Sequence, residues 1–194
     1  MKKILIINGH PDTESFCFGL HERYKKGALQ NVNSSEVREI VLARMSFNPI
    51  LTYGFRKRTE LEPDLLDAQE KLLWAEHIVW IYPTWWASPP ALLKGFVERV
   101  FLPGFAFENT KYVAFPKKLL AGKTSEIISS MDAPVLIYKW IMRNIGGKMI
   151  SYGIGNYCGI KNTRTTYFAS LRTSTPQQRA RWLDKAESLG RSVN

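Results

Sequence analysis

Hydroxyl and imidazole side chains stand where the first apolar run of the chain ends. The run from Lys3 to Asn8 is rich in Ile and Leu and leads directly to His10. Thr13 and Ser15 follow, just before a stretch of helical spacing. Backbone N–H groups at the start of a helix, joined by hydroxyl groups, bind phosphate readily. The loop is therefore a candidate phosphate site, although Thr13 and Ser15 would serve equally well as simple helix caps.

Two tryptophans and a polar turn follow later strands. Trp85 and Trp86 come after Pro83, in a loop where large aromatic side chains can lie against a planar ring. Core packing or a dimer surface would also account for them. After the next predicted strand, the turn Ser129-Ser130-Met131-Asp132 offers hydroxyl and amide donors. Together the three loops fit a ligand with a phosphate at one end and a flat heterocycle at the other, which is the shape of FMN.

The loops are positioned by strands and helices that alternate along the chain. We expect strands near residues 3–8, 36–42, 78–82, 124–129 and 161–168, and helices near 15–29, 64–74, 89–101, 134–145 and 176–192. Ser88 is the expected cap of the third helix, with Pro89 as its first residue, and Gly146-Gly147 is expected to close the fourth. Such alternation predicts one α/β domain over residues 1–194, with a parallel sheet between helices. Ligands bind such sheets beyond the carboxyl ends of the strands.

Well-known phosphate motifs do not account for these loops. The sequence contains neither G-x-G-x-x-G nor the complete P-loop pattern G-x-x-x-x-G-K-[ST]. A dinucleotide fingerprint of the Rossmann type and an NTPase P-loop are therefore not expected.

Several stretches resemble a known family. They are the loop 10–16, the segments 47–50 and 82–86, and above all Pro90-Ala91-Leu92-Leu93-Lys94-Gly95-Phe96-Val97-Glu98-Arg99-Val100-Phe101, continued by residues 104–107. The chain resembles the flavodoxin-like NAD(P)H quinone oxidoreductases, which include DT-diaphorase and the bacterial ancillary flavoproteins of potassium efflux systems. The resemblance covers most of the chain and becomes vague beyond about residue 145. It implies a flavodoxin-like three-layer sandwich, with a five-stranded parallel sheet and helices on both faces.

The same resemblance implies how a flavin is bound. The flavin phosphate is expected at His10, Ser15, Phe16 and Cys17. The isoalloxazine is expected against Pro83, Thr84, Trp85 and Trp86, with Ser129, Ser130, Met131 and Asp132 along its other edge. The long C-terminal extension of the animal enzymes is missing, which favours FMN over FAD as the cofactor.

Two departures from the family concern the catalytic residues. Relatives often carry Thr-Thr-Gly-Gly where this chain has Ser130-Met131-Asp132-Ala133. Tyr138 matches the family's tyrosine and is the predicted catalytic residue, with an ordinary partly buried tyrosine as the alternative. The histidine that follows it in the quinone reductases is replaced by Asn144. We expect the Asp132 carboxylate to face a backbone amide or a helix start, because an inward charge would oppose the reduced flavin.

The expected reaction passes a hydride from NAD(P)H through bound flavin to a quinone or similar acceptor. A regulatory flavoprotein partner of a membrane transporter and an electron-carrier flavodoxin are the alternatives. The basic run Arg56-Lys57-Arg58 would meet the 2′-phosphate of NADPH or form a solvated loop, so both NADH and NADPH stay open. The family also implies a homodimer, for which the aromatic segment Phe101 to Phe115 offers an apolar surface.

Composition limits the remaining possibilities. The 194 residues carry 27 basic and 17 acidic side chains, a net charge of +10 that favours anionic partners. No apolar run reaches the roughly 20 residues of a membrane span, and the N-terminal run is too short for a signal peptide. With two cysteines and three histidines, a cytoplasmic protein without a metal site is expected. Lys117-Lys118 beside Tyr112 and Phe115 lacks any nucleic-acid motif, so nucleic acid is not an expected partner.

Overall fold

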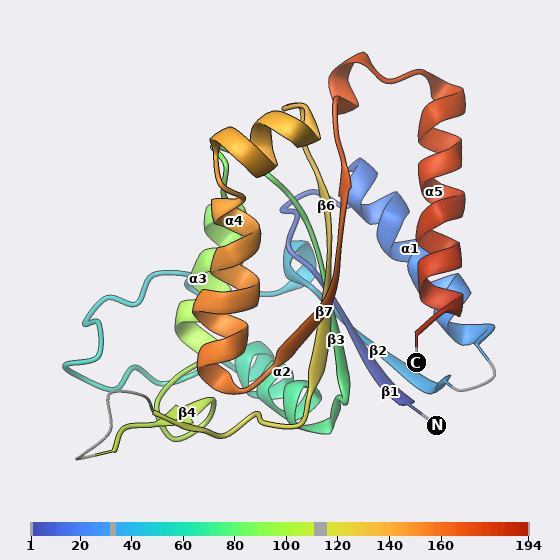
Figure 1. Ribbon diagram of the computed structural model, residues 1–194. Coiled ribbons are helices and arrows are strands. Elements are labelled where there is room, and N and C mark those ends of the chain that lie inside the picture. Colours follow the sequence, from blue (N-terminus) through green and yellow to red (C-terminus); the bar gives the residue numbers. More distant parts are fainter. Residues whose placement is uncertain (1, 32–33, 111–115, 194) are drawn as a thin grey trace.

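A parallel sheet of five strands forms the centre of the molecule (Figure 1). The computed structural model describes residues 2–31, 34–110 and 116–193. In spatial order the strands are β2 (Ser34–Val41), β1 (Lys2–Asn8), β3 (His77–Pro83), β6 (Thr124–Ser130) and β7 (Lys161–Phe168), and all neighbours are parallel. The strands β1 and β3 are apolar runs buried along nearly their whole length, as strands covered on both faces must be. The predicted sheet is confirmed.

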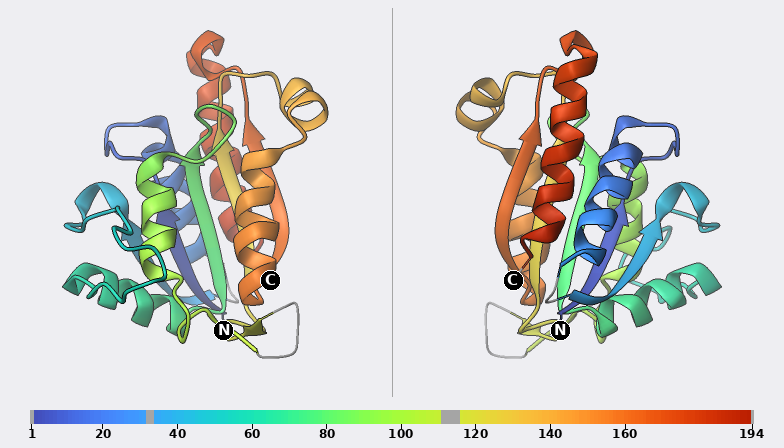
Figure 2. Two further views of the ribbon diagram at one scale, coloured as in Figure 1. Left: turned by 90° about the vertical axis from the view of Figure 1, so that its left-hand side faces the viewer. Right: turned by 90° about the vertical axis from the view of Figure 1, so that its right-hand side faces the viewer.

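Helices cover both faces of this sheet, as the two side views show (Figure 2). One face carries α1 (Phe16–Leu29) and α5 (Pro176–Arg191); the other carries α2 (Pro63–Trp74), α3 (Ala91–Val100) and α4 (Ile145–Lys148), which continues as the π-helical segment η3 (Met149–Asn156). Ile4 and Ile6 of β1 pack towards α1 and α5, whereas Leu5 and Ile7 pack towards the other layer. The expected three-layer arrangement is confirmed. None of the helices in the described part of the chain is both long and apolar enough to cross a bilayer.

Short elements fill the connections. They are η1 (Leu42–Arg44), the antiparallel pair β4 (Phe107–Glu108) and β5 (Lys117–Lys118), η2 (Ile137–Ile141) and η4 (Leu171–Thr173). The predicted apolar surface at residues 101–115 needs correction, because Phe101, Ala106 and Phe107 are buried in the protein's own core. Tyr112 and Phe115 lie outside the described residues. The described part of this segment therefore offers little apolar surface to a second copy.

The start of α3 differs from the prediction. The helix begins at Ala91, and its N-cap Pro90 has an extended backbone with φ −56° and ψ 152°. No side chain caps it, because the Ser88 hydroxyl donates to the carbonyl of Pro89 instead (2.9 Å). The reason is the second proline: a residue before proline is kept out of the helical region, so Pro89 cannot begin the helix.

Gly146 and Gly147 lie inside a helix rather than at its end. The helical stretch that begins after Pro134 is interrupted earlier, at Arg143 and Asn144, which adopt left-handed φ angles of 53° and 54°. A Cβ on Gly146 would lie 2.5 Å from the carbonyl oxygen of Ala87 and 2.9 Å from the Tyr138 hydroxyl. Glycine is needed here for a close approach between α4 and the loop after β3, and the predicted role as a helix stop is wrong.

One carboxylate lies inside the sheet. Glu126, in the middle of β6, is 1% exposed and accepts hydrogen bonds from the Tyr24 hydroxyl and from Arg164 Nε, the latter at 2.6 Å. The ring of His77 lies 3.5 Å away. Burial alone would raise the pKa of Glu126, but the nearby His77 ring and the hydrogen bonds from Arg164 and Tyr24 outweigh it, and the pKa lies below its ordinary 4.5. An ion pair between the buried Glu126 carboxylate and the partly exposed Arg164 guanidinium therefore joins β6 to β7, and the Tyr24 hydroxyl ties α1 to the same carboxylate.

Candidate functional site

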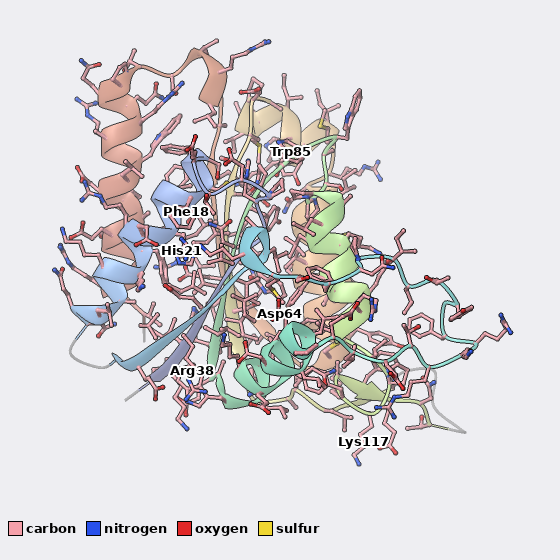
Figure 3. The ribbon with its side chains drawn as sticks, turned by 180° about the vertical axis from the view of Figure 1, so that it is seen from behind. Phe18, His21, Arg38, Asp64, Trp85 and Lys117 are labelled. Carbon is pink, nitrogen blue, oxygen red and sulfur yellow. The ribbon has the colours of Figure 1, made fainter. Side chains whose placement is uncertain are left out.

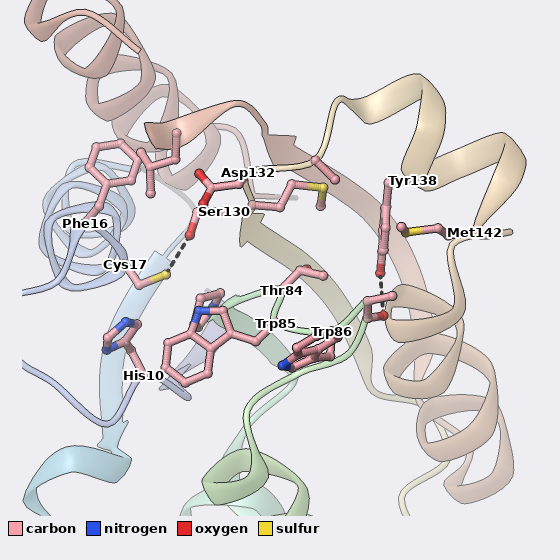
Figure 4. Close-up of a pocket in the computed structure, with 15 residues that line it drawn as sticks. His10, Phe16, Cys17, Thr84, Trp85, Trp86, Ser130, Asp132, Tyr138 and Met142 are labelled. Atoms are coloured by element: carbon pink, nitrogen blue, oxygen red, sulfur yellow. Dashed lines mark hydrogen bonds between the residues drawn. The ribbon is translucent and has the colours of Figure 1, made fainter. Parts of the chain in front are cut away.

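A cavity of about 480 Å³ opens at the carboxyl ends of β1, β3 and β6 (Figure 4). The chain passes from β1 to β2 on one side and then to β3 on the other, so strand order reverses between β1 and β3. In open α/β sheets this switch point is where ligands bind, since the loops on either side diverge and leave a crevice. The cavity lies within the size range of small-molecule sites.

The cavity unites most of the residues predicted to form the site. Its wall contains His10, Phe16, Cys17, Pro83, Thr84, Trp85, Trp86, Ser130, Met131, Asp132 and Tyr138. Two predicted residues, Ser15 and Ser129, do not line it. The Ser15 hydroxyl accepts from the N–H of Phe18 (3.3 Å), and Ser129 is fully buried with its hydroxyl 2.8 Å from that of Thr84. Both serines therefore support the wall from behind.

The loop after β1 is held by its own side chains. The N–H of His10 donates to Asn8 Oδ1 (3.0 Å), and the N–H of Asp12 donates to His10 Nδ1 (3.0 Å). Because Nδ1 accepts a hydrogen bond, the neutral ring carries its proton on Nε2, which is a donor for a ligand. Burial lowers the pKa of His10 below 6.5, against the opposing charge of Asp12, which favours this neutral form.

The start of α1 forms the floor beside this loop. Ser15 satisfies the N–H of Phe18, so the remaining N–H groups of the first turn can serve an anion. Cys17 Sγ lies 3.2 Å from Ser130 Oγ and joins α1 to the end of β6 across the cavity (Figure 4). Burial raises the pKa of Cys17 to about 12, so the side chain is a neutral thiol. This end of the cavity can therefore hold a phosphate without an opposing thiolate.

A strained turn carries the two tryptophans. The backbones of Trp85 and Ser88 exchange two hydrogen bonds of 2.9 and 3.0 Å around Trp86 and Ala87. Both central residues have positive φ angles, 50° and 60°, which cost roughly 1–2 kcal/mol for each residue other than glycine. Strain of this kind is retained where surrounding structure or function requires the geometry. The turn places Trp85 edge-on to the His10 ring, with centroids 5.3 Å apart, and leaves Trp86 fully exposed at the rim.

Tyr138 reaches the opposite end of the cavity. Its hydroxyl accepts from the N–H of Gly147 (3.2 Å) and donates to the carbonyl of Ala87 at 3.4 Å, a long and weak bond. Burial raises its pKa above 10.0, so the group is a neutral donor. Asn144, the predicted replacement of a histidine, accepts from the Tyr167 hydroxyl through its side chain, while its backbone N–H donates to the backbone carbonyl of Tyr138 (3.0 Å). The geometry thus gives Tyr138 a proton to donate without a histidine behind it.

The orientation expected of Asp132 is confirmed. Its Oδ1 accepts from the backbone N–H of Arg172 at 2.8 Å, so its charge is directed to the loop after β7. The same loop supplies Leu171, a lining residue that was not predicted. Ala87 and Met142 also line the cavity without having been predicted. Leu171 follows the last strand and Met142 stands four residues after Tyr138, so the strand-end rule and helical spacing could have found them.

Other chemically suggestive groups lie apart from the cavity. His21, Glu22 and Glu39 bring ligand atoms within 4.8 Å of one another. His21 is labelled below Phe18 in Figure 3. Lys25 already pairs with Glu39 at 2.6 Å and supplies the positive charge that a metal would bring. A Gly122-Lys123-Thr124 sequence precedes a strand instead of following one, and the Lys123 ammonium donates to the Leu73 and Ala75 carbonyls. It therefore caps α2 and is not a phosphate loop.

The basic run at Arg56 to Arg58 is exposed on the long loop before α2. The cations of Arg56 and Lys57 lie 6.0 and 5.0 Å from the centre of the Tyr53 ring. Lys57 and Arg58 also border a second cavity of about 400 Å³, which does not share a residue with the first. The solvated-loop interpretation fits this exposure, and nothing brings the run to the main cavity.

Comparisons with known proteins agree with this architecture. A family model described as a flavodoxin-like fold matches residues 2–189. An uncharacterized NAD(P)H oxidoreductase of Haemophilus influenzae is 29% identical over 190 residues, covering 94% of this chain and 91% of its own. The rat ribosyldihydronicotinamide dehydrogenase [quinone] is 24% identical, covering 97% and 92%. An FMN-dependent NADH-azoreductase of Bacillus anthracis, solved with FMN, superposes with a TM-score of 0.75 at 18% identity, covering 98% of each chain.

Proposed function

We propose a function on one established premise: the chain belongs to the family with a flavodoxin-like fold whose model matches residues 2–189. It is a flavin-dependent NAD(P)H oxidoreductase that binds FMN and passes a hydride to a quinone or similar acceptor. The observation that carries the proposal is the convergence of three strand-end loops on one cavity at the switch point of the sheet. Relatives named NAD(P)H oxidoreductase, quinone dehydrogenase and FMN-dependent azoreductase support it.

The two ends of the cavity match the two ends of FMN. The helix start at Phe16 and the Nε2 proton of His10 suit the phosphate. Trp85 and the Thr84 backbone lie where a flat ring would enter, and Ser130 to Ala133 face them across the cavity. Bound flavin supplies the hydride chemistry, accepting from NAD(P)H and giving to the acceptor.

The residues of the protein would bind the flavin, orient its ring and stabilise the charge that the ring gains on reduction. Backbone N–H groups near Ser130 to Ala133 are candidates to face the ring edge that gains negative charge on reduction, and Asp132 is turned away from it. Tyr138 offers a neutral hydroxyl at the other end, where the acceptor or nicotinamide would approach. The proposal includes both NADH and NADPH as possible hydride donors. Cys17 and Cys158 are buried free thiols, so we also propose a cytoplasmic location.

Replacing Trp85 with Ala should weaken FMN binding about tenfold, since the lost aromatic contact is worth roughly 1 kcal/mol or slightly more. Titration of the purified protein with FMN, followed by flavin fluorescence, measures the affinity. Trp74→Ala is the matched control, because Trp74 ends α2 under the Arg38 guanidinium and does not line the cavity. Absence of any FMN signal at high micromolar concentration in the unmodified protein would contradict the proposal itself.

The homodimer implied by the family remains part of the proposal. Since Phe101, Ala106 and Phe107 are buried, we place the contact at the exposed loop before α2, where Ile50 and Phe55 are 64% and 71% exposed. Sedimentation at micromolar concentration should give about twice the 22.3 kDa chain mass, and Phe55→Glu should shift the equilibrium towards monomer. A monomer in the unmodified protein contradicts the dimer, and an unaffected Phe55→Glu dimer contradicts its location.

A further inference from the structure

Two polar side chains stand behind Tyr138 without lining the cavity themselves. The Tyr167 hydroxyl, from β7, donates a hydrogen bond to Asn144 Oδ1. The rings of Tyr138 and Tyr167 meet edge-on, with their centroids 5.3 Å apart and their planes at 74°. Burial raises the pKa of Tyr167, so its hydroxyl stays a neutral donor. Neither Tyr167 nor Asn144 is among the residues that line the cavity, so any effect they have on a ligand must pass through Tyr138 or its neighbours.

Asn144 lies at a break in the helical backbone. Arg143 and Asn144 both adopt left-handed φ angles, which are unfavourable for residues other than glycine and least so for Asn. The N–H of Asn144 donates to the carbonyl of Tyr138 (3.0 Å), and its carbonyl accepts from the N–H of Lys148 (2.9 Å). Because Tyr167 holds the side chain as well, Asn144 is fixed through both its backbone and its amide.

This anchored break sets the first turn of α4 against the Tyr138 hydroxyl. The N–H groups of a first helical turn have no partner within the helix, and that of Gly147 donates to the Tyr138 hydroxyl oxygen at 3.2 Å. A Cβ on Gly147 would collide with both the Tyr167 hydroxyl and Asn144 Oδ1, so the pair packs directly on this glycine. A hydroxyl that accepts a hydrogen bond becomes a stronger donor. Its own proton then points away from Gly147, to the Ala87 carbonyl or to a ligand in the cavity (Figure 4).

We propose that Tyr167, acting through Asn144, is a positioning residue for Tyr138. The pair holds the Gly147 N–H on the Tyr138 oxygen, so that the tyrosine presents its proton to the cavity. A neutral amide does not take up a proton near neutral pH as an imidazole does, so the pair orients the hydroxyl and does not relay a proton. The catalytic consequence rests on the proposed function, whereas the orientation of the hydroxyl does not require flavin.

Amide hydrogen exchange in the flavin-free protein tests the orientation. Tyr167→Phe keeps the ring and removes only the hydroxyl, and it should speed exchange of the Gly147 N–H by roughly fivefold or more, as expected when one hydrogen bond is weakened. Asn144→Gly removes the acceptor but tolerates the left-handed angle, and it should have the same effect. Asn144→Asp keeps an acceptor oxygen and should retain the protection. The matched control is Tyr82→Phe, which removes a buried hydroxyl that has no hydrogen-bond partner within the described chain and should leave the exchange unchanged.

Stopped-flow kinetics of the FMN-loaded protein test the catalytic consequence. Tyr167→Phe should slow the same half-reaction as Tyr138→Phe, by roughly fivefold or more, because the donor is no longer held in place. In Tyr138→Phe/Tyr167→Phe the second substitution should cost less than about twofold, since Tyr167 acts only through a hydroxyl that is already absent. A purely structural role for Tyr167 predicts instead that the two losses multiply.

Three results would overturn the proposal. The first is unchanged exchange of the Gly147 N–H in both Tyr167→Phe and Asn144→Gly. The second is faster exchange with unchanged rates of both half-reactions, and the third is multiplication of the two losses in the double variant. A protein that binds no FMN contradicts the proposed function instead, because exchange at Gly147 is measured without flavin and still decides whether Tyr167 positions Tyr138.

Discussion

Replacing Tyr138 with Phe should slow flavin reduction or reoxidation by roughly ten- to a thousandfold. This is the usual loss of rate when one positioned hydrogen-bond donor or general acid is removed from an active site. The hydroxyl now donates only to the Ala87 carbonyl at 3.4 Å, so it can turn to a ligand at little cost. FMN affinity should hardly change, because the phosphate end lies across the cavity. Stopped-flow traces of reduction by NADPH and reoxidation by a quinone measure the two half-reactions separately.

Tyr82→Phe is the matched control for this variant. Tyr82 is equally buried and close by, but its hydroxyl has no hydrogen-bond partner within the described chain and does not line the cavity. Its removal should leave both rates unchanged. Equal rates in unmodified protein and Tyr138→Phe would reduce Tyr138 to a structural residue whose hydroxyl only accepts from Gly147.

The pH profile gives an independent readout of the same residue. Burial raises the pKa of Tyr138, so it stays protonated as pH rises through neutrality, and burial lowers the pKa of His10, which favours its neutral form. With Asn144 in the place of histidine, the rate should be flatter between about pH 6 and 8 than in a histidine-assisted enzyme. A clear titration step within this range would indicate a different proton donor.

The strands and helices were predictable where local chemistry and tertiary structure agree. The strand at 161–168 has the predicted bounds, and Thr175 caps α5 through the N–H of Gln178 as its motif indicates. The position of the site was predictable from the predicted strands. Parallel strands bring their carboxyl ends to one edge of the sheet, so the polar or aromatic residues that follow them must meet there.

Features that depend on close contact between segments far apart in the chain were not predictable from the local sequence. Gly146 has the sequence context of a helix stop, yet it is required by the Ala87 carbonyl and the Tyr138 hydroxyl, which lie far away in the chain. The turn at Trp86 and Ala87 adopts backbone angles that favour Asn-Gly, so its residue types argue against the observed conformation. The direction of the Trp86 side chain, towards solvent, depends on that turn. Here tertiary contacts override the local backbone preferences of the residues.

Replacing Arg164 with Met should destabilise the fold by about 3 kcal/mol at neutral pH, the low end of the loss when one partner of a buried ion pair is removed, because the Glu126 carboxylate is buried but the Arg164 side chain is 33% exposed. Glu126 would stay buried with only Tyr24 and the His77 ring beside it. The variant would also lose the bonds from Arg164 to Ser192 and Leu189, which tie β7 to the end of α5. Equilibrium unfolding in denaturant measures the loss.

The pH dependence of that loss identifies the buried carboxylate as its source. In the unmodified protein the pKa of Glu126 is lowered, so its stabilisation is present above the ordinary pKa of 4.5 and is lost as pH falls through the folded value. Without Arg164, burial dominates and raises that pKa, so the ionised carboxylate destabilises the fold at neutral pH and protonation relieves it. The difference between the two proteins should therefore narrow as pH falls.

Two further variants separate this mechanism from a general loss of contacts. Glu126→Leu/Arg164→Met removes both charges and should recover much of the stability that Arg164→Met loses, since an apolar pair needs no compensating charge. Lys117→Met breaks an exposed pair with Glu108, 3.3 Å apart, and should cost no more than about 1 kcal/mol. If the double variant is as unstable as Arg164→Met and the loss is the same at every pH, the cause is the missing contact with α5 and the buried charge of Glu126 is not responsible.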